Sequence, residues 1–435
     1  MEFEVLKRSH LKRNIIIGVV VVAIISAIIL TFTRAKYRTS YSVPLINGTI
    51  NYSAADLNIV AITVDGEEVD TIPTGNYELT EESYCEVNGV RDDSVDLSYD
   101  MESQMLTVTP MTTKGTKCYL YFNKKQNAGE GILANYTNQL TRSDFNKPVT
   151  DTTTGTIYYA DTSKGRTYYF AGNPTDNWVR FAGFYWRIIR INEDGSIRMI
   201  YNGTSMATTG TTTQVTVNGS NTSVFSSTYQ NNAYVGYMYM SQQVHGLTND
   251  STIKGVLDQW YQTNLANYTN QISTEAGFCG DRQPSTRDTT SNGRGGIGTT
   301  QTYYGAYIRL ANTLINPTFD CENESDLYTV ASSSQGNNAL DYPIGLITAD
   351  EVIYAGGVFG NNTGYYLYTS ESYWTMSPSY YSTGARVFRV LSGGQLNSSN
   401  SVDNTYGVRP VINLSPNVTI TGGNGTVNSP FEVAA

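Results

Sequence analysis

The sequence has very few histidines, the residue on which much acid–base catalysis and many metal sites depend. It contains two, His10 and His245. A Ser–His–Asp triad or a histidine metal site would have to rest on His245, because His10 precedes the longest apolar run of the chain. The Gly-rich stretch 291–300 lacks the GK[ST] ending of a phosphate-binding loop. The sequence therefore favours a protein that is not an enzyme, with no cofactor and no metal site.

Charged residues are also scarce. They make up 15% of the 435 residues, and the net charge is −10. A nucleic-acid-binding protein needs a basic face, so nucleic acid is excluded as a partner. Tyrosine is abundant instead, with 34 Tyr against 13 Phe. Such a composition is typical of surfaces that recognise partners, and equally of β-rich secreted proteins that place Tyr and Thr on strands.

One long apolar run stands near the start of the sequence. Residues 14–33, NIIIGVVVVAIISAIILTFT, carry no charge and follow the basic stretch 7–13. A helix of this length spans the hydrocarbon core of a bilayer, about 30 Å. We expect a single-pass signal anchor at 14–33 that contacts the lipid bilayer. The basic tail 1–13 is expected inside the cell, and the bulk of the chain outside the cell membrane.

The four cysteines have none of the CxxC spacing of zinc or thioredoxin-like sites. They are Cys85, Cys118, Cys279 and Cys321. Pairing in sequence order gives two disulfides, Cys85–Cys118 and Cys279–Cys321, each within one predicted domain. In the chain-entropy model each adds about 3–4 kcal/mol of stability. Disulfides also agree with an extracytoplasmic location.

Turn and strand signals divide the remaining chain. Short strands fill 41–123, with a hairpin signal at Asp65-Gly66, and predict a small all-β sandwich that acts as a stalk. The polar stretch 124–150 reads as a linker with one short helix around 131–140. The expected main domain covers 151–425, followed by a tail at 426–435.

Within the main domain, local patterns predict both strands and helices. Residues 181–203 predict a hairpin around Asp194-Gly195. The apolar spacing in 251–265 predicts an amphipathic helix, whose core-facing residues are Ile253, Val256, Leu257, Trp260 and Tyr261. A second helix is expected at 348–357, where Thr348 and Glu351 fit a capping box. The expected fold class is α+β, with a few helices packed on a mostly antiparallel β-sheet.

Four segments together resemble a known family. They are FAGFYWRIIRINEDGSIRMIY (181–201), YWTMSP (373–378), RVFRVLSGG (386–394) and YGVRPVINL (406–414). In this order they resemble a domain of unknown function of bacterial surface proteins, and through it the C-type-lectin-like superfamily. That superfamily includes formylglycine-generating enzymes and variable proteins diversified by retroelements. The resemblance covers about 151–415.

The resemblance implies that the last three segments form neighbouring strands of one sheet. It also implies a set of fold-defining residues: Trp186, Trp374, Arg389, Gly393, Gly394, Gly407, Arg409 and Pro410. Two differences between this sequence and the superfamily limit which functions can be expected. No cysteine follows Cys321, so formylglycine-generating activity is not expected, and the calcium-dependent sugar motifs of animal lectins are absent.

The polar middle of 373–414 has the composition of a displayed binding surface. The expected ligand-binding residues are Tyr380, Tyr381, Ser382, Arg386, Gln395, Asn397, Ser399, Asn400, Asn404 and Tyr406. The alternative is a solvated pair of loops in which Asn and Ser serve turns.

These observations predict a membrane-anchored bacterial cell-surface protein with a lectin-like, adhesin-type head. Its partner would be an extracellular glycan or protein ligand. Two alternatives stay open: an ectoenzyme that acts on glycans or cell-wall polymers through a carboxylate pair that sequence spacing does not reveal, and a structural envelope protein.

Overall fold

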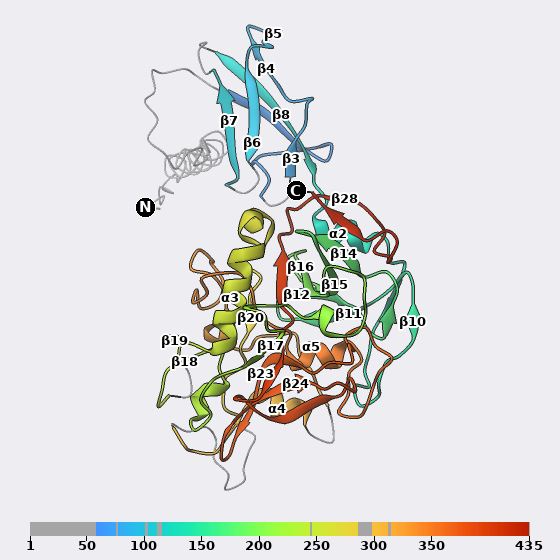
Figure 1. Cartoon of the computed structure of the whole chain (residues 1–435). Coiled ribbons are helices and arrows are strands. Elements are labelled where there is room, and N and C mark those ends of the chain that lie inside the picture. Colours follow the sequence, from blue (N-terminus) through green and yellow to red (C-terminus); the bar gives the residue numbers. More distant parts are fainter. Residues whose placement is uncertain are drawn as a thin grey trace, which may run out of the picture. The chain divides into compact units, whose positions relative to one another are not determined.

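The computed structural model divides the chain into two compact units, Met1–Lys125 and Gln126–Ala435 (Figure 1). It describes residues 58–74, 77–100, 103–110, 115–243, 246–285, 298–311 and 315–434. The predicted basic tail 1–13, the predicted anchor 14–33 and both histidines lie outside these ranges. Within them, no helix is both long and apolar enough to cross a membrane.

The described part of the first unit consists of strands. One sheet has the order β2-β1-β8-β4-β5, with β3 also paired to β8. Its members are β1 (Asn58–Val64), β2 (Glu67–Val69), β3 (Tyr77–Leu79), β4 (Tyr84–Val87), β5 (Val90–Arg91) and β8 (Thr116–Lys124). The predicted turn joins β1 to β2, and Asp65 and Gly66 both have positive φ, 50° and 88°.

A second, two-stranded sheet shares the core of this unit. It pairs β6 (Asp96–Asp100) with β7 (Met105–Thr109). Leu106 of β7 is buried with Leu120 and Phe122 of β8, so apolar side chains of both sheets fill one small core. Cys85 lies directly opposite Cys118 on β4 and β8, and the two form the predicted disulfide.

The second unit begins with a nine-stranded sheet of order β28-β29-β14-β15-β12-β11-β9, in which β16 links β15 to β27. The strands are β9 (Asn138–Leu140), β11 (Thr156–Thr162), β12 (Gly165–Tyr169), β14 (Trp178–Phe181), β15 (Phe184–Ile191), β16 (Ile197–Tyr201), β27 (Val411–Leu414), β28 (Ile420–Gly422) and β29 (Phe431–Val433). The predicted hairpin around Asp194-Gly195 is β15–β16, and Gly195 takes φ 82° at its turn.

The unit starts and ends at different residues from the predicted domain. The expected linker 124–150 contains helix α2 (Ala128–Leu133) and β9, which pairs with β11. The expected tail 426–435 contains β29, which pairs with β14. All three residues of β9 are exposed, so this strand has no apolar alternation that could separate it from a loop.

A second sheet has the order β17-β26-β23-β24-β25, with β21 also paired to β23. Its strands are β17 (Thr222–Val224), β21 (Thr302–Tyr303), β23 (Tyr373–Tyr381), β24 (Ala385–Val390), β25 (Leu396–Ser401) and β26 (Thr405–Gly407). The motif strands β26, β23 and β24 are therefore neighbours. The segment 407–414 is divided, however, because Gly407 ends β26 and Val411 begins β27 in the other sheet.

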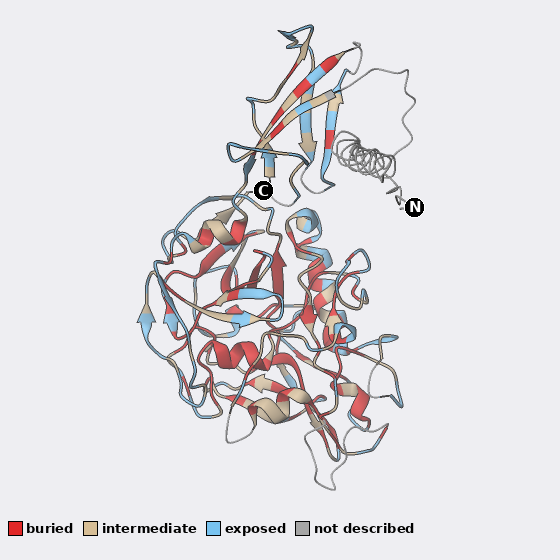
Figure 2. Ribbon diagram, turned by 180° about the vertical axis from the view of Figure 1, so that it is seen from behind, coloured by how far each residue is buried: buried red, intermediate tan, exposed pale blue. Residues whose placement is uncertain are grey.

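Helices are few in the described ranges. Helix α3 (Thr252–Asn264) matches the predicted amphipathic helix, with Ser251 as its N-cap and Trp260 packed against Trp186 and Tyr201. Helix α5 (Ala349–Tyr354) has the predicted capping box of Thr348 and Glu351, and Figure 2 shows it buried. Helix α4 is Gly305–Leu310.

The remaining elements are short. The strands are β10 (Thr152–Thr153), β13 (Asn173–Pro174), β18 (Met238–Tyr239), β19 (Asn249–Asp250), β20 (Phe278–Cys279) and β22 (Leu327–Tyr328), and the 3-10 helices are η1 (Thr211–Thr213), η2 (Asn232–Val235), η3 (Ala266–Gln271) and η4 (Glu324–Asp326). The described chain is thus β-rich with mixed, mostly antiparallel sheets and few helices.

Candidate ligand-binding site

The predicted binding residues belong to a largely buried sheet. Every residue of β23 except Tyr380 is buried, and α4, α5 and η2 all pack against this strand. Tyr381 is 3% exposed and donates its hydroxyl hydrogen to the Gln230 carbonyl oxygen. Asn400 is 5% exposed and donates to the Asn397 side-chain oxygen. These two side chains point into the protein interior, because helices cover the strands that carry them.

The other predicted residues are half-buried or exposed, and the structure brings some of them together. The Arg386 guanidinium lies 5.3 Å from the ring centroid of Tyr380 and donates to the Ser399 carbonyl oxygen. Tyr406 instead packs with Arg389, and Asn397 lies opposite Arg389 on the neighbouring strand. Ser382, Gln395 and Asn404 form no hydrogen bond or ion pair with either group, and of the three only Asn404 is exposed.

The residues that the resemblance marks as fold-defining are mostly buried. Trp186, Trp374 and Arg409 have no exposed surface. The Arg409 guanidinium donates to the carbonyl oxygens of Tyr201 and Leu367, which ties the chain near β27 to two distant segments. The Pro410 carbonyl accepts from the Tyr201 amide.

Close packing explains the glycines among the fold-defining residues. A Cβ atom on Gly394 would lie 1.8 Å from the Asn362 carbonyl oxygen, one on Gly407 2.0 Å from Gln214 Nε2, and one on Gly393 2.5 Å from Gln395 Oε1. The first of these contacts is with backbone, so it has little room to relax. Gly394 also has a φ of 80°, which favours glycine.

A cavity of about 480 Å³ opens elsewhere in the second unit. We call it the Phe319 cavity. Five separate segments line it, and its lining residues are Thr162, Ser163, Lys164, Arg190, Asn192, Glu193, Asp194, Glu275, Ala276, Gly277, Phe319, Asp320, Cys321, Glu324, Leu327, Ser334 and Gln335. The lining holds five carboxylates and two basic side chains. Its size falls in the range of small-molecule sites.

Hydrogen bonds hold the walls of this cavity in place. Glu275 accepts from the Ser333 hydroxyl and from the Ser334 and Gln335 amides. Burial alone would raise the pKa of Glu275, but these bonds hold it below its usual range. On the opposite wall, Asp320 accepts from the amide and hydroxyl of Ser163. The carboxylates of Glu275 and Asp320 are therefore ordered before any ligand arrives.

One aromatic residue, Phe319, belongs to the lining of the cavity. Phe319 stacks on Tyr354 with 3.8 Å between ring centroids, and the Arg190 guanidinium lies 4.9 Å from the Phe319 centroid. The disulfide Cys279–Cys321 is present as predicted, and its Cys321 also lines the cavity.

A smaller cavity of about 50 Å³ shares Arg190, Phe319 and Cys321 with the Phe319 cavity and contains a charged network. Glu351 pairs with Arg198 and Arg190, at 2.5 and 3.4 Å. Arg309 bridges Asp281 and Asp350, at 2.6 and 3.0 Å. Burial, only partly offset by Arg309, raises the pKa of Asp281 to about 6. Most of the charged side chains in this smaller cavity are therefore paired with one another.

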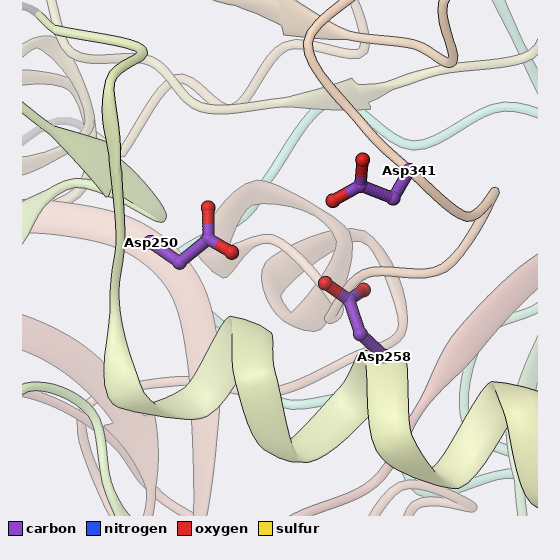
Figure 3. A group of neighbouring side chains, drawn as sticks. All are labelled: Asp250, Asp258 and Asp341. Carbon is purple, nitrogen blue, oxygen red and sulfur yellow. The ribbon is translucent and has the colours of Figure 1, made fainter.

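Three carboxylates also converge around helix α3, those of Asp250, Asp258 and Asp341 (Figure 3). The buried ammonium group of Lys254 bonds to all three, at 3.2, 2.6 and 3.2 Å. Burial raises the pKa of Asp258 to about 6 in spite of this partner. We call this group the Lys254 cluster. Because the Lys254 ammonium group already lies between the three carboxylates, we interpret the Lys254 cluster as a structural ion cluster.

Sequence reasoning missed the Phe319 cavity. Its polar residues come from five segments without periodicity, and the one local signal was the Asp194-Gly195 turn, which forms part of the wall. A family model described as a domain of unknown function (DUF6273) matches residues 348–416, which run from α5 through β27. No curated protein matches the chain, and no solved structure matches it.

Proposed function

We propose that the second unit is the ligand-binding head of a membrane-anchored bacterial surface protein, and that the Phe319 cavity binds a saccharide unit of an extracellular glycan. The observation that carries this proposal is a cavity of about 480 Å³ whose polar walls are already ordered around one aromatic ring. Because these protein groups are already ordered, the protein loses less side-chain entropy when a ligand binds.

The chemistry of the lining suits a polyhydroxylated ligand. The Glu324 carboxylate is exposed and has no hydrogen bond or ion pair within the described residues. Such carboxylate oxygens accept hydrogen bonds from sugar hydroxyls. Tyr354 covers one face of the Phe319 ring and Arg190 the other, so Phe319 offers its edge to the apolar face of a sugar ring. Five carboxylates against two basic groups disfavour an anionic ligand in this cavity.

We further propose that this head is C-type-lectin-like. The adjacency of β26, β23 and β24 agrees with the strand arrangement that the resemblance implies. The match to a domain of unknown function over 348–416 agrees with the family part of the resemblance. An adhesin-type role follows if residues 14–33 anchor the chain, and membrane fractionation of cells that express the full chain, with and without residues 1–40, tests that anchor.

Binding of the full-length protein to an array of neutral glycans tests the proposal. The variants Phe319→Leu and Glu324→Gln should each weaken binding about tenfold, the effect of one lost apolar contact or one charged hydrogen bond. Glu322→Gln, which changes a nearby exposed carboxylate outside the cavity, should bind like the wild type. Absence of binding to every glycan, or equal binding by all variants, contradicts the proposal.

The several carboxylates of the cavity also favour one alternative, a glycan-cleaving ectoenzyme. The same array distinguishes the two functions, because an enzyme releases reducing ends from its substrate over time. Release that disappears in Glu193→Gln or Glu275→Gln would establish the alternative.

A further inference from the structure

Arg389 packs on an aromatic pair at one end of the second sheet. Its guanidinium carbon lies 3.6 Å from the ring centroid of Tyr406. Tyr406 in turn meets Trp374 edge to face at 4.9 Å. Trp374 is fixed by a 2.8 Å hydrogen bond from its indole nitrogen to the Ser223 carbonyl oxygen. The position of the guanidinium is therefore set by rigid neighbours.

Arg389 is the one arginine in the described ranges whose side chain has neither a hydrogen bond nor an ion pair. All the others have at least one, and they are Arg91, Arg142, Arg166, Arg180, Arg187, Arg190, Arg198, Arg282, Arg309, Arg386 and Arg409. The Nε atom of Arg389 is buried without a partner. Its terminal nitrogens are not among the buried unpartnered atoms, so they reach solvent.

A half-buried cation without a counterion costs free energy. Burial lowers the pKa of Arg389 to about 10, and no carboxylate of the described chain offsets that effect. The protein has 38 acidic residues and a net charge of −10, so an unneutralised guanidinium is unusual here. Stacking on Tyr406 compensates only part of the lost solvation, because a cation–π contact is weaker than a hydrogen-bonded ion pair.

Two further donors lie beside this guanidinium. Asn397 is the cross-strand partner of Arg389, so their side chains share one face of the sheet. The Asn397 side-chain oxygen already accepts from the Ser399 amide and the Asn400 amide group, which leaves its NH₂ group unused. The Tyr406 hydroxyl has no hydrogen bond within the described residues.

We propose that Arg389, Asn397 and Tyr406 form a binding site for a carboxylate group of a ligand. The guanidinium rests one face on Tyr406 and keeps its terminal nitrogens for the ligand, and this planar fork matches the two oxygens of a carboxylate. The Asn397 amide and the Tyr406 hydroxyl supply additional donors. None of the three residues lines the Phe319 cavity, so this site is independent of the proposed saccharide cavity.

Calorimetric titration of the full-length protein with glucuronate, acetate and glucose tests the site. Glucuronate and acetate should bind with saturation, and glucose should not bind at Arg389. If acetate binds as well as glucuronate, the site recognises a carboxylate of any source. Preferential binding of glucuronate identifies a sugar acid as the ligand. Absence of saturable binding by both carboxylates overturns the proposal.

Substitutions at the three residues test whether the carboxylate binds at this site. Arg389→Gln should weaken carboxylate binding about 10–100-fold, and Asn397→Ala about 3–10-fold. Arg389→Lys should fall between the wild type and Arg389→Gln, because lysine keeps the charge and loses the fork. Tyr406→Phe keeps the stacked ring and removes only the hydroxyl, so it weakens binding without unfolding the sheet.

A matched control is available at Arg166, whose guanidinium also lies over a tyrosine, 4.2 Å from the Tyr159 centroid, but pairs with Asp161. Arg166→Gln should bind carboxylates like the wild type, and so should Phe319→Leu. Unchanged binding in folded Arg389→Lys and Tyr406→Phe, or equal loss in Arg166→Gln, contradicts the assignment.

Discussion

At the scale of single residues, the Lys254 cluster shows how a side chain can replace a bound cation. The lysine is fully buried, whereas Asp250 and Asp341 keep 44% and 70% of their side-chain surface exposed. The ammonium group thus lies beneath carboxylates that still face water. Helix α3 holds the arrangement, because Lys254 and Asp258 lie four residues apart on one helix face.

Replacement of Lys254 by methionine tests this interpretation. The variant keeps the aliphatic stem but leaves three carboxylates facing one another, so we expect a loss of roughly 3 kcal/mol in the free energy of unfolding. The three ligand oxygens lie within 4.8 Å of one another, and oxygen clusters suit Ca²⁺. Millimolar Ca²⁺ should therefore raise the melting temperature of Lys254→Met more than that of the wild type.

Lys147→Met provides the comparison, because Lys147 forms an exposed pair with Asp144. Exposed pairs contribute about 0–1 kcal/mol. Urea unfolding of the two variants should separate them clearly. If both variants lose the same free energy of unfolding, the Lys254 cluster stabilises the protein no more than an exposed ion pair does.

At the scale of elements, helix α5 depends on one side chain with two roles. Glu351 completes the capping box by accepting from the Thr348 amide. The same carboxylate pairs with Arg198 of β16 and Arg190 of β15. A short buried helix is thereby fastened both to its own start and to the hairpin of the other sheet.

The pH dependence of Glu351→Gln follows from this geometry. Burial would raise the pKa of Glu351, but Arg198 and Arg190 hold it below its usual value of 4.5. A lowered pKa gives stability that is complete above pH 4.5 and is lost as the pH falls through the folded-state value. At pH 7 the free energy of unfolding of the wild type should be about 3–5 kcal/mol larger than that of the variant. This difference should become smaller as the pH approaches 3.

Urea unfolding at pH 7, 5 and 3 measures this difference. Glu322→Gln changes an exposed carboxylate that has no ion pair within the described residues, so its free energy of unfolding should match that of the wild type at each pH. A difference for Glu351→Gln that is independent of pH would show that the charge of Glu351 is not the stabilising feature.

The elements that sequence predicted are those with local causes. The β15–β16 turn follows from Asp194-Gly195, helix α3 from its apolar spacing, and the cap of α5 from Thr348 and Glu351. The pairing of strands that lie far apart in the sequence had no such local signal. The division of 407–414 between two sheets occurs at Val408–Pro410, and nothing in those residues reveals that Val411 pairs with Ile200 of β16.

The candidate site was harder to predict for the same reason. The polar composition of 380–406 suggested a displayed surface, but Tyr381 and Asn400 face the interior because helices cover the sheet. The Phe319 cavity unites residues from 162 to 335 that no periodic pattern connects. Arg389 was predicted as a fold residue by resemblance, and only its lack of partners in three dimensions indicates a ligand.

At the scale of the whole second unit, the end of the chain is part of the core. Phe431 is 1% exposed, and it lies in β29, which pairs with β14 at Val179. Phe431→Ala should lower the free energy of unfolding by about 3–5 kcal/mol, the usual cost of deleting a buried aromatic side chain. Val427, which is 38% exposed, offers the control Val427→Ala, with an expected change below about 0.5 kcal/mol.

Circular dichroism during urea unfolding measures both variants. If Phe431→Ala is as stable as the wild type, residues 426–435 are a tail after all, as the sequence first indicated.

The start of the second unit is hydrogen-bonded to a segment near its end. The Ala128 amide donates to the Pro416 carbonyl oxygen, and helix α2 contacts β28. The start of the unit therefore lies beside the segment that leads to its last strand, β29. A segment with adjacent termini can be moved as a cassette: it can be inserted into a surface loop of a host protein, or its ends can be linked and new ones opened elsewhere. We therefore expect the second unit, taken through β29 so that β14 keeps its partner, to keep its two sheets after transplantation or circular permutation.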